Sequence, residues 1–169
     1  MGIALLFISV LLFAYSMIFV QSGLIKRLWV TGSVILLAII AVTLILNDTE
    51  HFGMKQVTEV QEFDLLANEK NSPAKKLVYK KLGNGQEKIY FYRTKRSGPA
   101  KLKKTDPMTT KVFVKRDPAN KLTVAKNYWV YTNGWSKFYF AGGQPNHQFI
   151  DQRFAFHIDQ SWQLSEYKK

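Results

Sequence analysis

The side chains best suited to acid–base or metal chemistry near neutral pH are three histidines, His51, His147 and His157. Their spacing does not match a metal-ligand pattern such as H-E-x-x-H, and the chain has no cysteine that could complete a zinc site. His157 and Asp159 would share one face of a predicted strand, where a surface pair explains them more simply than a catalytic dyad. The sequence therefore predicts no metal site.

Nucleophilic and phosphate-binding motifs are missing as well. Ser136 and Ser161 do not lie in a G-x-S-x-G setting, and the chain contains neither a P-loop nor a G-x-G-x-x-G motif. We therefore expect a protein that is not an enzyme and that holds no cofactor.

Positive charge is the clearest chemical feature of the sequence. Between Lys70 and Lys126 there are 17 Lys and Arg residues and three acidic residues. A cluster this dense attracts anionic polymers, lipid headgroups or nucleic acid. The alternative is a solvated, lysine-rich face that protects the edge of a β-sheet from aggregation. The candidate anion-binding residues are Arg93, Lys95, Arg96, Lys101, Lys103 and Lys104.

Aromatic residues are the second feature, because most of them lie in the same part of the chain as the basic residues. Exposed rings beside Lys or Arg stack on sugars or bases. Packing in a β-sheet core is the alternative explanation for most of them. The candidate stacking residues are Trp135, which falls at a predicted turn, Tyr90 and Tyr139.

The charged residues are confined to the later part of the chain. Residues 1–47 contain only Lys26 and Arg27 as charged side chains, whereas residues 48–169 hold the other 22 basic and all 12 acidic residues. Two uncharged stretches, residues 3–20 and 28–46, each nearly match the ~30 Å of a hydrocarbon core at about 1.5 Å per residue. We therefore predict a two-helix transmembrane hairpin over residues 1–47.

The basic residues near the ends of these spans predict the orientation of the hairpin. Lys26 and Arg27 lie in the link between the spans, and such residues favour the cytoplasmic side. Both termini, and the domain that follows, are then extracytoplasmic. A cleaved signal peptide is the alternative for the first stretch, but a basic n-region and an A-x-A cleavage site are missing.

After residue 70 the pattern favours β-strands that pair across turns. Residues 77–82 and 89–94 flank Gly83-Asn84-Gly85, which is a strong hairpin signal. Two further hairpins are predicted, one joining residues 111–115 to 122–126 and one joining residues 128–132 to 138–141 across Asn133-Gly134. Residues 153–159 alternate, with Phe154, Phe156 and Ile158 on one face.

These elements predict a small, mainly antiparallel β domain, a barrel or sandwich of six to seven strands, over residues 76–169. Residues 48–75 would form a linker with either a first strand or a short helix over residues 57–66. The octet NGQEKIYF at residues 84–91 matches NGWSKFYF at residues 133–140. The match indicates either a duplicated hairpin unit or two independent hairpins.

The order of these features resembles a family of uncharacterised small two-span membrane proteins of lactic acid bacteria, known as a domain of unknown function. The resemblance is carried by the uncharged first span, the link that ends in Lys26-Arg27, the second span, the strand YWVY at residues 128–131 and the tail SWQL at residues 161–164. It covers nearly the full chain and implies a location in the cell membrane of a Gram-positive bacterium. It implies no activity and no functional residues.

Three functional hypotheses follow. The first is a membrane-anchored, non-enzymatic cell-envelope protein whose basic β domain binds an anionic surface polymer, lipid headgroups or a membrane-protein partner. The second is a structural or accessory subunit whose hairpin docks into a membrane complex. The third is an OB-like barrel that binds single-stranded nucleic acid, which an external location disfavours.

Overall fold

The computed structural model describes residues 1–67, 75–83, 87–97 and 101–167. The chain divides into two compact units. The first unit comprises residues 1–57 and 129–148, and the second comprises residues 58–128 and 149–169.

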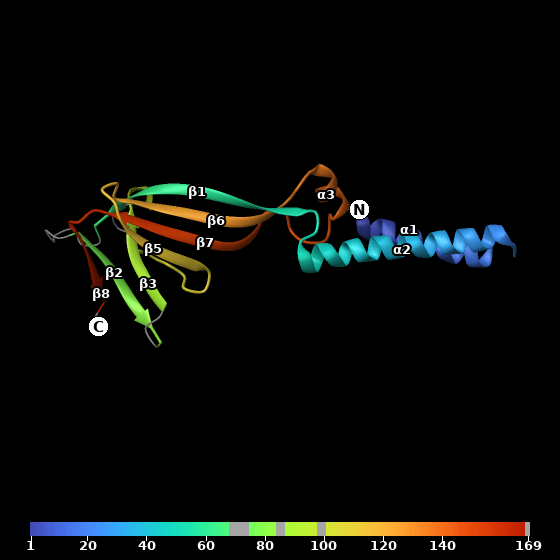
Figure 1. The fold of residues 1–169 in the computed structure, drawn as a ribbon, viewed down its shortest axis with the longest axis horizontal. Coiled ribbons are helices and arrows are strands. Elements are labelled where there is room, and N and C mark those ends of the chain that lie inside the picture. The colour runs from blue at the N-terminus through green and yellow to red at the C-terminus, as the bar shows by residue number, and fades with distance from the viewer. Residues whose placement is uncertain (68–74, 84–86, 98–100, 168–169) are drawn as a thin grey trace. The chain divides into compact units, whose positions relative to one another are not determined.

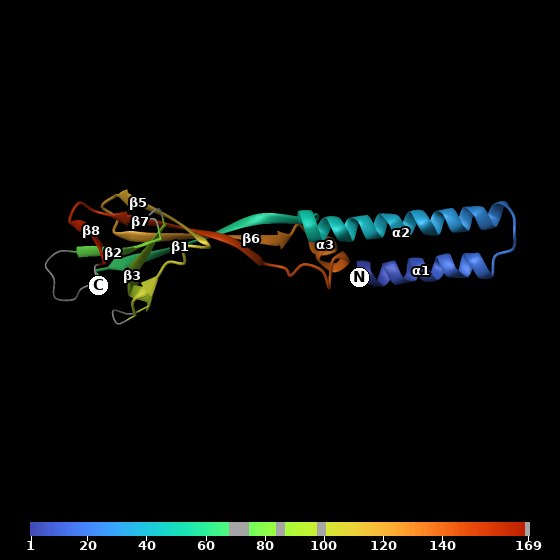
Figure 2. The same cartoon turned by 90° about the horizontal axis from the view of Figure 1, so that it is seen from below.

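Two apolar helices dominate the first unit, α1 (Gly2–Ile18) and α2 (Leu24–Glu50). They run antiparallel along each other (Figure 1, Figure 2). At one end the Lys26 Nζ donates a hydrogen bond of 2.8 Å to the carbonyl oxygen of Met17. At the other end a Cβ placed on Gly2 would lie 2.9 Å from Leu44 Cδ2, so only glycine fits this approach without a shift. The antiparallel pairing of the two helices is therefore as predicted, but a second membrane-spanning helix is not supported, because α1 is too short for the length that α2 reaches.

The two helices differ in length. With 27 residues, α2 is about 40 Å long and is long and apolar enough to cross a membrane. With 17 residues, α1 is apolar but only about 25 Å long. The structure also places Lys26 and Arg27 in the first turns of α2 and not in the link. Helix α2 begins earlier than predicted because Gly23, at φ +146°, redirects the chain at its N-cap.

A short third helix, α3 (Gly134–Tyr139), completes the first unit. It corrects the predicted hairpin across Asn133-Gly134. The Asn133 side chain accepts a hydrogen bond of 2.8 Å from the Ser136 backbone N–H, which is an N-cap contact. The residues that favour a tight turn here begin a helix, and residues 138–141 form no strand.

Within the described residues, eight strands form one sheet in the order β5-β7-β6-β1-β3-β2-β8, with β4 paired to β3. The sheet curls into a half-barrel (Figure 1). A mainly β domain is thus confirmed, although it has eight strands in a single sheet, and the β2–β8 and β5–β7 pairs are parallel. The strands are β1 (Met54–Leu66), β2 (Lys75–Leu82), β3 (Glu87–Thr94), β4 (Lys103–Lys104), β5 (Thr110–Arg116), β6 (Lys121–Tyr131), β7 (Gln148–Ile158) and β8 (Trp162–Glu166).

One predicted hairpin is confirmed and another is wrong. Strands β2 and β3 pair antiparallel, with Leu82 opposite Glu87, and their turn residues 84–86 lie outside the described residues. Strands β5 and β6 do not pair, because β7 lies between them in the sheet. The turn itself forms, since Asp117 Oδ1 accepts from the Ala119 N–H at 3.0 Å. A turn signal predicts a reversal of the chain but not which strand fills the space beside it.

The core of the second unit lies on one face of this sheet. Phe154, Phe156 and Ile158 are buried, as their alternation predicted. Phe156 lies edge-on to Tyr92 at a centroid distance of 5.7 Å. Leu65, Leu77, Leu122, Val124 and Trp162 complete the cluster.

Truncating Phe156 to alanine is expected to lower the free energy of unfolding by about 3–5 kcal/mol, because its ring is fully buried and leaves a cavity. Urea unfolding of the full-length chain in detergent micelles, followed by near-UV circular dichroism, measures the loss. The matched control is Phe113→Ala on the neighbouring strand β5, where the ring is 51% exposed. Equal losses for the two variants would contradict the placement of the core.

Candidate functional site

The inward face of three adjacent strands changes from apolar to polar along its length. On β1 it runs from Leu65 through Phe63 to Gln61, because alternate residues share a face. On β6 it runs from Leu122 and Val124 to Lys126. The buried ends of these rows belong to the core, and the polar ends line a cavity.

Strand β7 repeats the pattern beside β6, from Ile158 and Phe156 through Phe154 to Gln152. Three neighbouring strands therefore exchange core side chains for polar ones along the same face. The cavity is the open continuation of the hydrophobic core, and its floor keeps the apolar side chains of Phe63, Val124 and Phe154.

Strands β3 and β4 supply the other wall. Lys103 on β4 is paired with Tyr92 on β3, and paired residues on antiparallel strands share a face. The segment is fixed along β3 by Thr105, whose N–H donates to the Tyr90 carbonyl and whose Oγ1 accepts from the Tyr90 N–H. Lys103 and, two residues earlier, Lys101 are therefore directed toward Tyr92.

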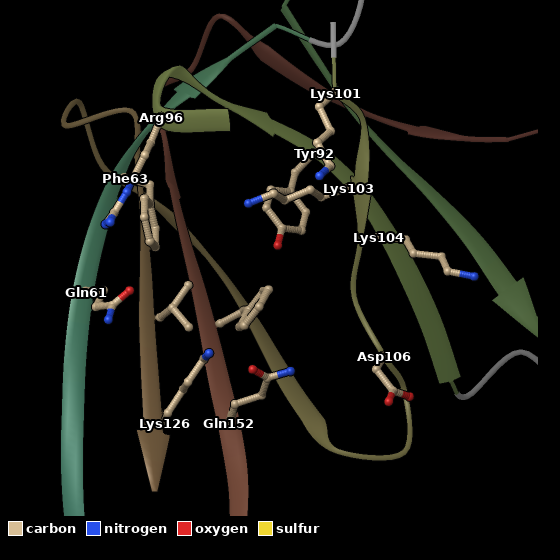
Figure 3. A pocket seen from close by; sticks show the side chains of 12 residues that line it. Gln61, Phe63, Tyr92, Arg96, Lys101, Lys103, Lys104, Asp106, Lys126 and Gln152 are labelled. Carbon is tan, nitrogen blue, oxygen red and sulfur yellow. The ribbon is translucent and has the colours of Figure 1, made fainter. Parts of the chain in front are cut away.

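The cavity has a volume of about 620 Å³. In Figure 3, Lys101 and Lys103 reach toward Tyr92, and the Lys126 ammonium extends from the opposite side toward the middle. The Lys104 side chain also lines the cavity, but its ammonium points away from the other three lysines. The residues lining the cavity are Gln61, Phe63, Tyr92, Arg96, Lys101, Lys103, Lys104, Asp106, Val124, Lys126, Gln152 and Phe154.

Five cationic side chains and one carboxylate are found among these lining residues. The carboxylate, Asp106, is engaged locally, since it accepts hydrogen bonds from the Met108 N–H at 3.1 Å and from Thr109 Oγ1 at 3.3 Å. Arg96 lies over the ring of Phe63 at 5.9 Å from its centroid. Burial raises the pKa of the Tyr92 hydroxyl, which therefore stays neutral near pH 7. The cavity is strongly electropositive and has an apolar floor.

Four of the six predicted anion-binding residues meet at this cavity, namely Arg96, Lys101, Lys103 and Lys104. The other two lie elsewhere. Lys95 forms an ion pair of 3.1 Å with Asp64. Arg93 is half-buried and its Nε has no hydrogen-bond partner within the described part of the chain.

The three predicted stacking residues lie apart from the cavity. Tyr90 packs in the core against Phe156, at a centroid distance of 5.7 Å. Tyr139 lies on α3, and its hydroxyl is 2.8 Å from Thr43 Oγ1. Trp135, also on α3, is 79% exposed, and its ring lies edge-on to Phe138.

One comparison with known proteins identifies the family. The profile described as "Domain of unknown function (DUF4811)" matches residues 22–168. The chain belongs to the DUF4811 family. No curated protein and no solved structure matches it. The matched range of the DUF4811 domain includes α2 and every residue of the cavity, and it begins after α1.

Lys126 is the cavity residue of the DUF4811 domain that sequence reasoning missed most clearly. A signal for it exists, because Lys126 continues the alternation of Leu122 and Val124 and so had to share their inward face. Gln152 stands in the same relation to Phe154 and Phe156. Lys126 stands at the end of the basic stretch, away from its densest part at residues 93–104, and Gln152 is uncharged, so charge density alone identifies neither residue.

A second polar cluster of the DUF4811 domain lies where β7 ends. His157 Nδ1 is 3.0 Å from Asp117 Oδ2 and so pairs with this residue, not with Asp159. The pKa of Asp117 is lowered, first by the Ala119 N–H and then by His157. Arg116 Nη1 donates to the carbonyl oxygens of Asp159 and Trp162. These bonds hold chain turns together, which indicates a structural role.

Asp159 is the most strongly perturbed member of this cluster. Hydrogen bonds from the Ser161 hydroxyl and from the Asn120 side chain lower its pKa from 3.8 to about 2, and Lys75, 3.8 Å away, adds to the effect. Because the folded state prefers the ionised carboxylate, its contribution to stability is complete above pH 4 or so and is lost as the pH falls toward about 2.

Asp159→Asn is expected to lower the melting temperature of the full-length chain in detergent at neutral pH. The same substitution should flatten the decline in melting temperature between about pH 4 and about pH 2, because the titrating group is gone. Thermal unfolding over a pH series measures both effects. Asp64→Asn, which removes the exposed pair with Lys95, is the matched control and should change little. Parallel pH curves for the wild type and Asp159→Asn would contradict the assignment.

Proposed function

We propose that this chain is a membrane-anchored, non-enzymatic cell-envelope protein whose cavity binds a stretch of an anionic surface polymer. The observation that carries the proposal is the convergence of Arg96, Lys101 and Lys103, from one basic segment, with Lys126 on strand β6, on one cavity with an apolar floor. A lysine-rich face that only solubilises a sheet would spread its charges outward. Here the ammonium groups of Lys103 and Lys126 point inward (Figure 3).

The lining favours a chain of alternating anionic and uncharged units. Each exposed cation contributes modestly to binding, so several contacts along one ligand are needed for useful affinity. The apolar floor between the cations, at Phe63 and Phe154, would contact the uncharged part of the repeat. A phosphodiester-linked polyol or glycan has this composition.

The helices support anchoring of the domain in a membrane. Large apolar side chains on their surfaces are exposed, such as Leu11 at 69%, Ile18 at 73% and Leu28 at 73%, and a surface of this kind is stable in lipid. The antiparallel packing of α1 on α2 supports two spans, since 17 residues lie at the lower limit for crossing a bilayer. Lys26 and Arg27 at the connected end support a cytoplasmic link and an extracytoplasmic cavity.

The test uses the full-length chain in nanodiscs of zwitterionic lipid. Fluorescence anisotropy compares a short glycerol phosphate oligomer with an uncharged polyol oligomer and a single-stranded oligonucleotide. We expect binding of the glycerol phosphate oligomer and none of the uncharged one. Stronger binding of the oligonucleotide would favour the nucleic-acid module instead, and no binding of either anion would refute the proposal.

The alternative function, an accessory subunit of a membrane complex, has its own supporting observation. An apolar groove of about 310 Å³ on the helix pair is lined by Leu12, Trp29, Gly32, Ser33 and others, and a Cβ on Gly32 would meet nothing within 4 Å. A transmembrane helix of a partner protein fits such a groove through close packing at the glycine. Crosslinking in native membranes that captures only monomers would count against this function.

A further inference from the structure

Helix α3 carries the most exposed aromatic side chain of the first unit, Trp135. Trp135 is 79% exposed and Phe138 is 53% exposed, and their rings lie edge-to-face at 6.2 Å. Positions 135, 138 and 139 share one face of a helix, whereas Lys137 lies away from it. Exposed Trp and Phe side chains on one face of a short helix form an apolar patch, and such a patch is typical of a surface that contacts another apolar phase or molecule.

The contacts of α3 fix its level along α2. The Tyr139 hydroxyl is 2.8 Å from Thr43 Oγ1, and Gly2 at the start of α1 lies against both Leu44 and the Tyr139 carbonyl oxygen. Thr43 precedes the first charged residue after the apolar stretch, Asp48, by five positions, which is about 7 Å of helix. Ser136, near the start of α3, lies instead beside Gly53, beyond the charged end of α2. Helix α3 therefore crosses the boundary between the apolar stretch of α2 and its charged end.

Polar contacts mark the other side of this boundary. Gln144, which follows α3 in the chain, donates a hydrogen bond of 2.7 Å from its Nε2 to Asp48 Oδ1. Asn47 is buried and donates from its Nδ2 to the Phe52 carbonyl oxygen at 2.8 Å. The polar and apolar residues around α3 thus separate along α2 in the order that a membrane–water interface requires.

We propose that α3 is an interfacial anchor, with Trp135 and Phe138 inserted at the headgroup–acyl boundary of the bilayer that holds α2. This inference rests on the membrane anchoring in the proposed function. Tryptophan is enriched at this depth because its ring is apolar and its N–H still reaches water or headgroups, and an interfacial helix buries its apolar face by about 5–10 Å. Lys137, off the aromatic face, would reach the lipid phosphates.

The chain has no cysteine, so single thiols can be labelled cleanly. Nitroxide labels are placed at Phe138→Cys, Trp135→Cys and Lys137→Cys in the full-length chain, reconstituted in nanodiscs of phosphatidylcholine and phosphatidylglycerol. Electron paramagnetic resonance then compares collision with apolar oxygen and with a water-soluble nickel chelate. We expect the labels at positions 135 and 138 to favour oxygen at least about fivefold more than the label at position 137.

A reference label at Val42→Cys, on a 53% exposed position of α2, separates two kinds of failure. If the label at position 42 is in lipid but those at positions 135 and 138 are as open to nickel as the label at position 137, the interfacial role of α3 is wrong and the anchoring stands. If the label at position 42 is itself open to nickel, the anchoring fails and the inference falls with it. Two positions on α3 are labelled separately because each cysteine substitution removes one ring of the Trp135–Phe138 contact.

Discussion

Replacing Lys103 and Lys126 together with glutamate is expected to weaken binding of a glycerol phosphate oligomer about 100-fold at low salt. A charge pair at contact distance is worth about 1 kcal/mol in water-like surroundings, and a reversed charge replaces that attraction with repulsion. Two reversals therefore cost about 3 kcal/mol after allowance for screening, which is a factor of about 100. Fluorescence anisotropy with the full-length chain in zwitterionic nanodiscs measures the change.

The matched control reverses Lys80 on β2 and Lys111 on β5, which are exposed and do not line the cavity. It changes the net charge of the chain by the same amount, so the nonspecific electrostatic attraction between the anionic oligomer and the chain falls equally in both variants. We expect the control to weaken binding only severalfold. If both double variants lose affinity to the same extent, the ligand follows the overall charge of the domain and the cavity is not its site.

Moving the basic residues from one end of α2 to the other is expected to invert the protein in the membrane. The variant combines Lys26→Gln and Arg27→Gln with Thr49→Lys and Glu50→Lys, which transfers the positive charge to the opposite end of the span. Met108, which is 92% exposed in the second unit, is changed to cysteine as the only thiol. An impermeant maleimide should label the unmodified orientation in intact cells and should label the inverted one about tenfold less.

The control for this experiment exchanges Lys26 for arginine and Arg27 for lysine, which keeps both charges and should keep full labelling. Permeabilised cells report the total amount of protein in each case. Labelling of the Met108→Cys chain only after permeabilisation, with Lys26 and Arg27 in place, would show that the cavity faces the cytoplasm. That result would remove surface polymers from the set of ligands.

Local sequence patterns predicted the elements of the fold better than their pairing. The alternation of Phe154, Phe156 and Ile158 places these three apolar side chains on one face of a strand. That face is expected to pack in the core, and all three side chains are buried. The pairing of β7 with β5 joins residues far apart in the chain, such as Thr110 and Gln152, and leaves no mark near the turn at Asp117. Register and strand order are set by packing of the whole face, so a turn signal cannot supply them.

The two related octets show how tertiary contacts override local preference. In the first, residues 87–90 continue as strand β3, whereas in the second the matching residues 136–139 lie in α3. Asn133 caps the helix through Ser136, and Tyr139 is held by Thr43 on α2. Asparagine followed by glycine is suited both to a tight turn and to a helix start, so the neighbours decide between them.

Only those residues of the candidate site that lie close together in the sequence were predictable. Arg96, Lys101 and Lys103 stand close together in the chain, so charge density alone singles them out. Lys126 and Gln152 enter the cavity from β6 and β7, and only knowledge that these strands are neighbours brings them to it. Lys95 belongs to the same charge cluster but is paired with Asp64 on β1, a contact that sequence spacing does not reveal.

The salt dependence of glycerol phosphate binding tests the central claim most directly, because each cation that contacts a phosphate releases a counterion. With the four lining cations Arg96, Lys101, Lys103 and Lys126 engaged, the full-length chain in zwitterionic nanodiscs should show a plot of log K against log salt with a slope of about −3. The double reversal of Lys103 and Lys126 should bring the slope close to zero. A slope near zero for the wild type, or one that the double reversal leaves unchanged, would contradict binding in the cavity.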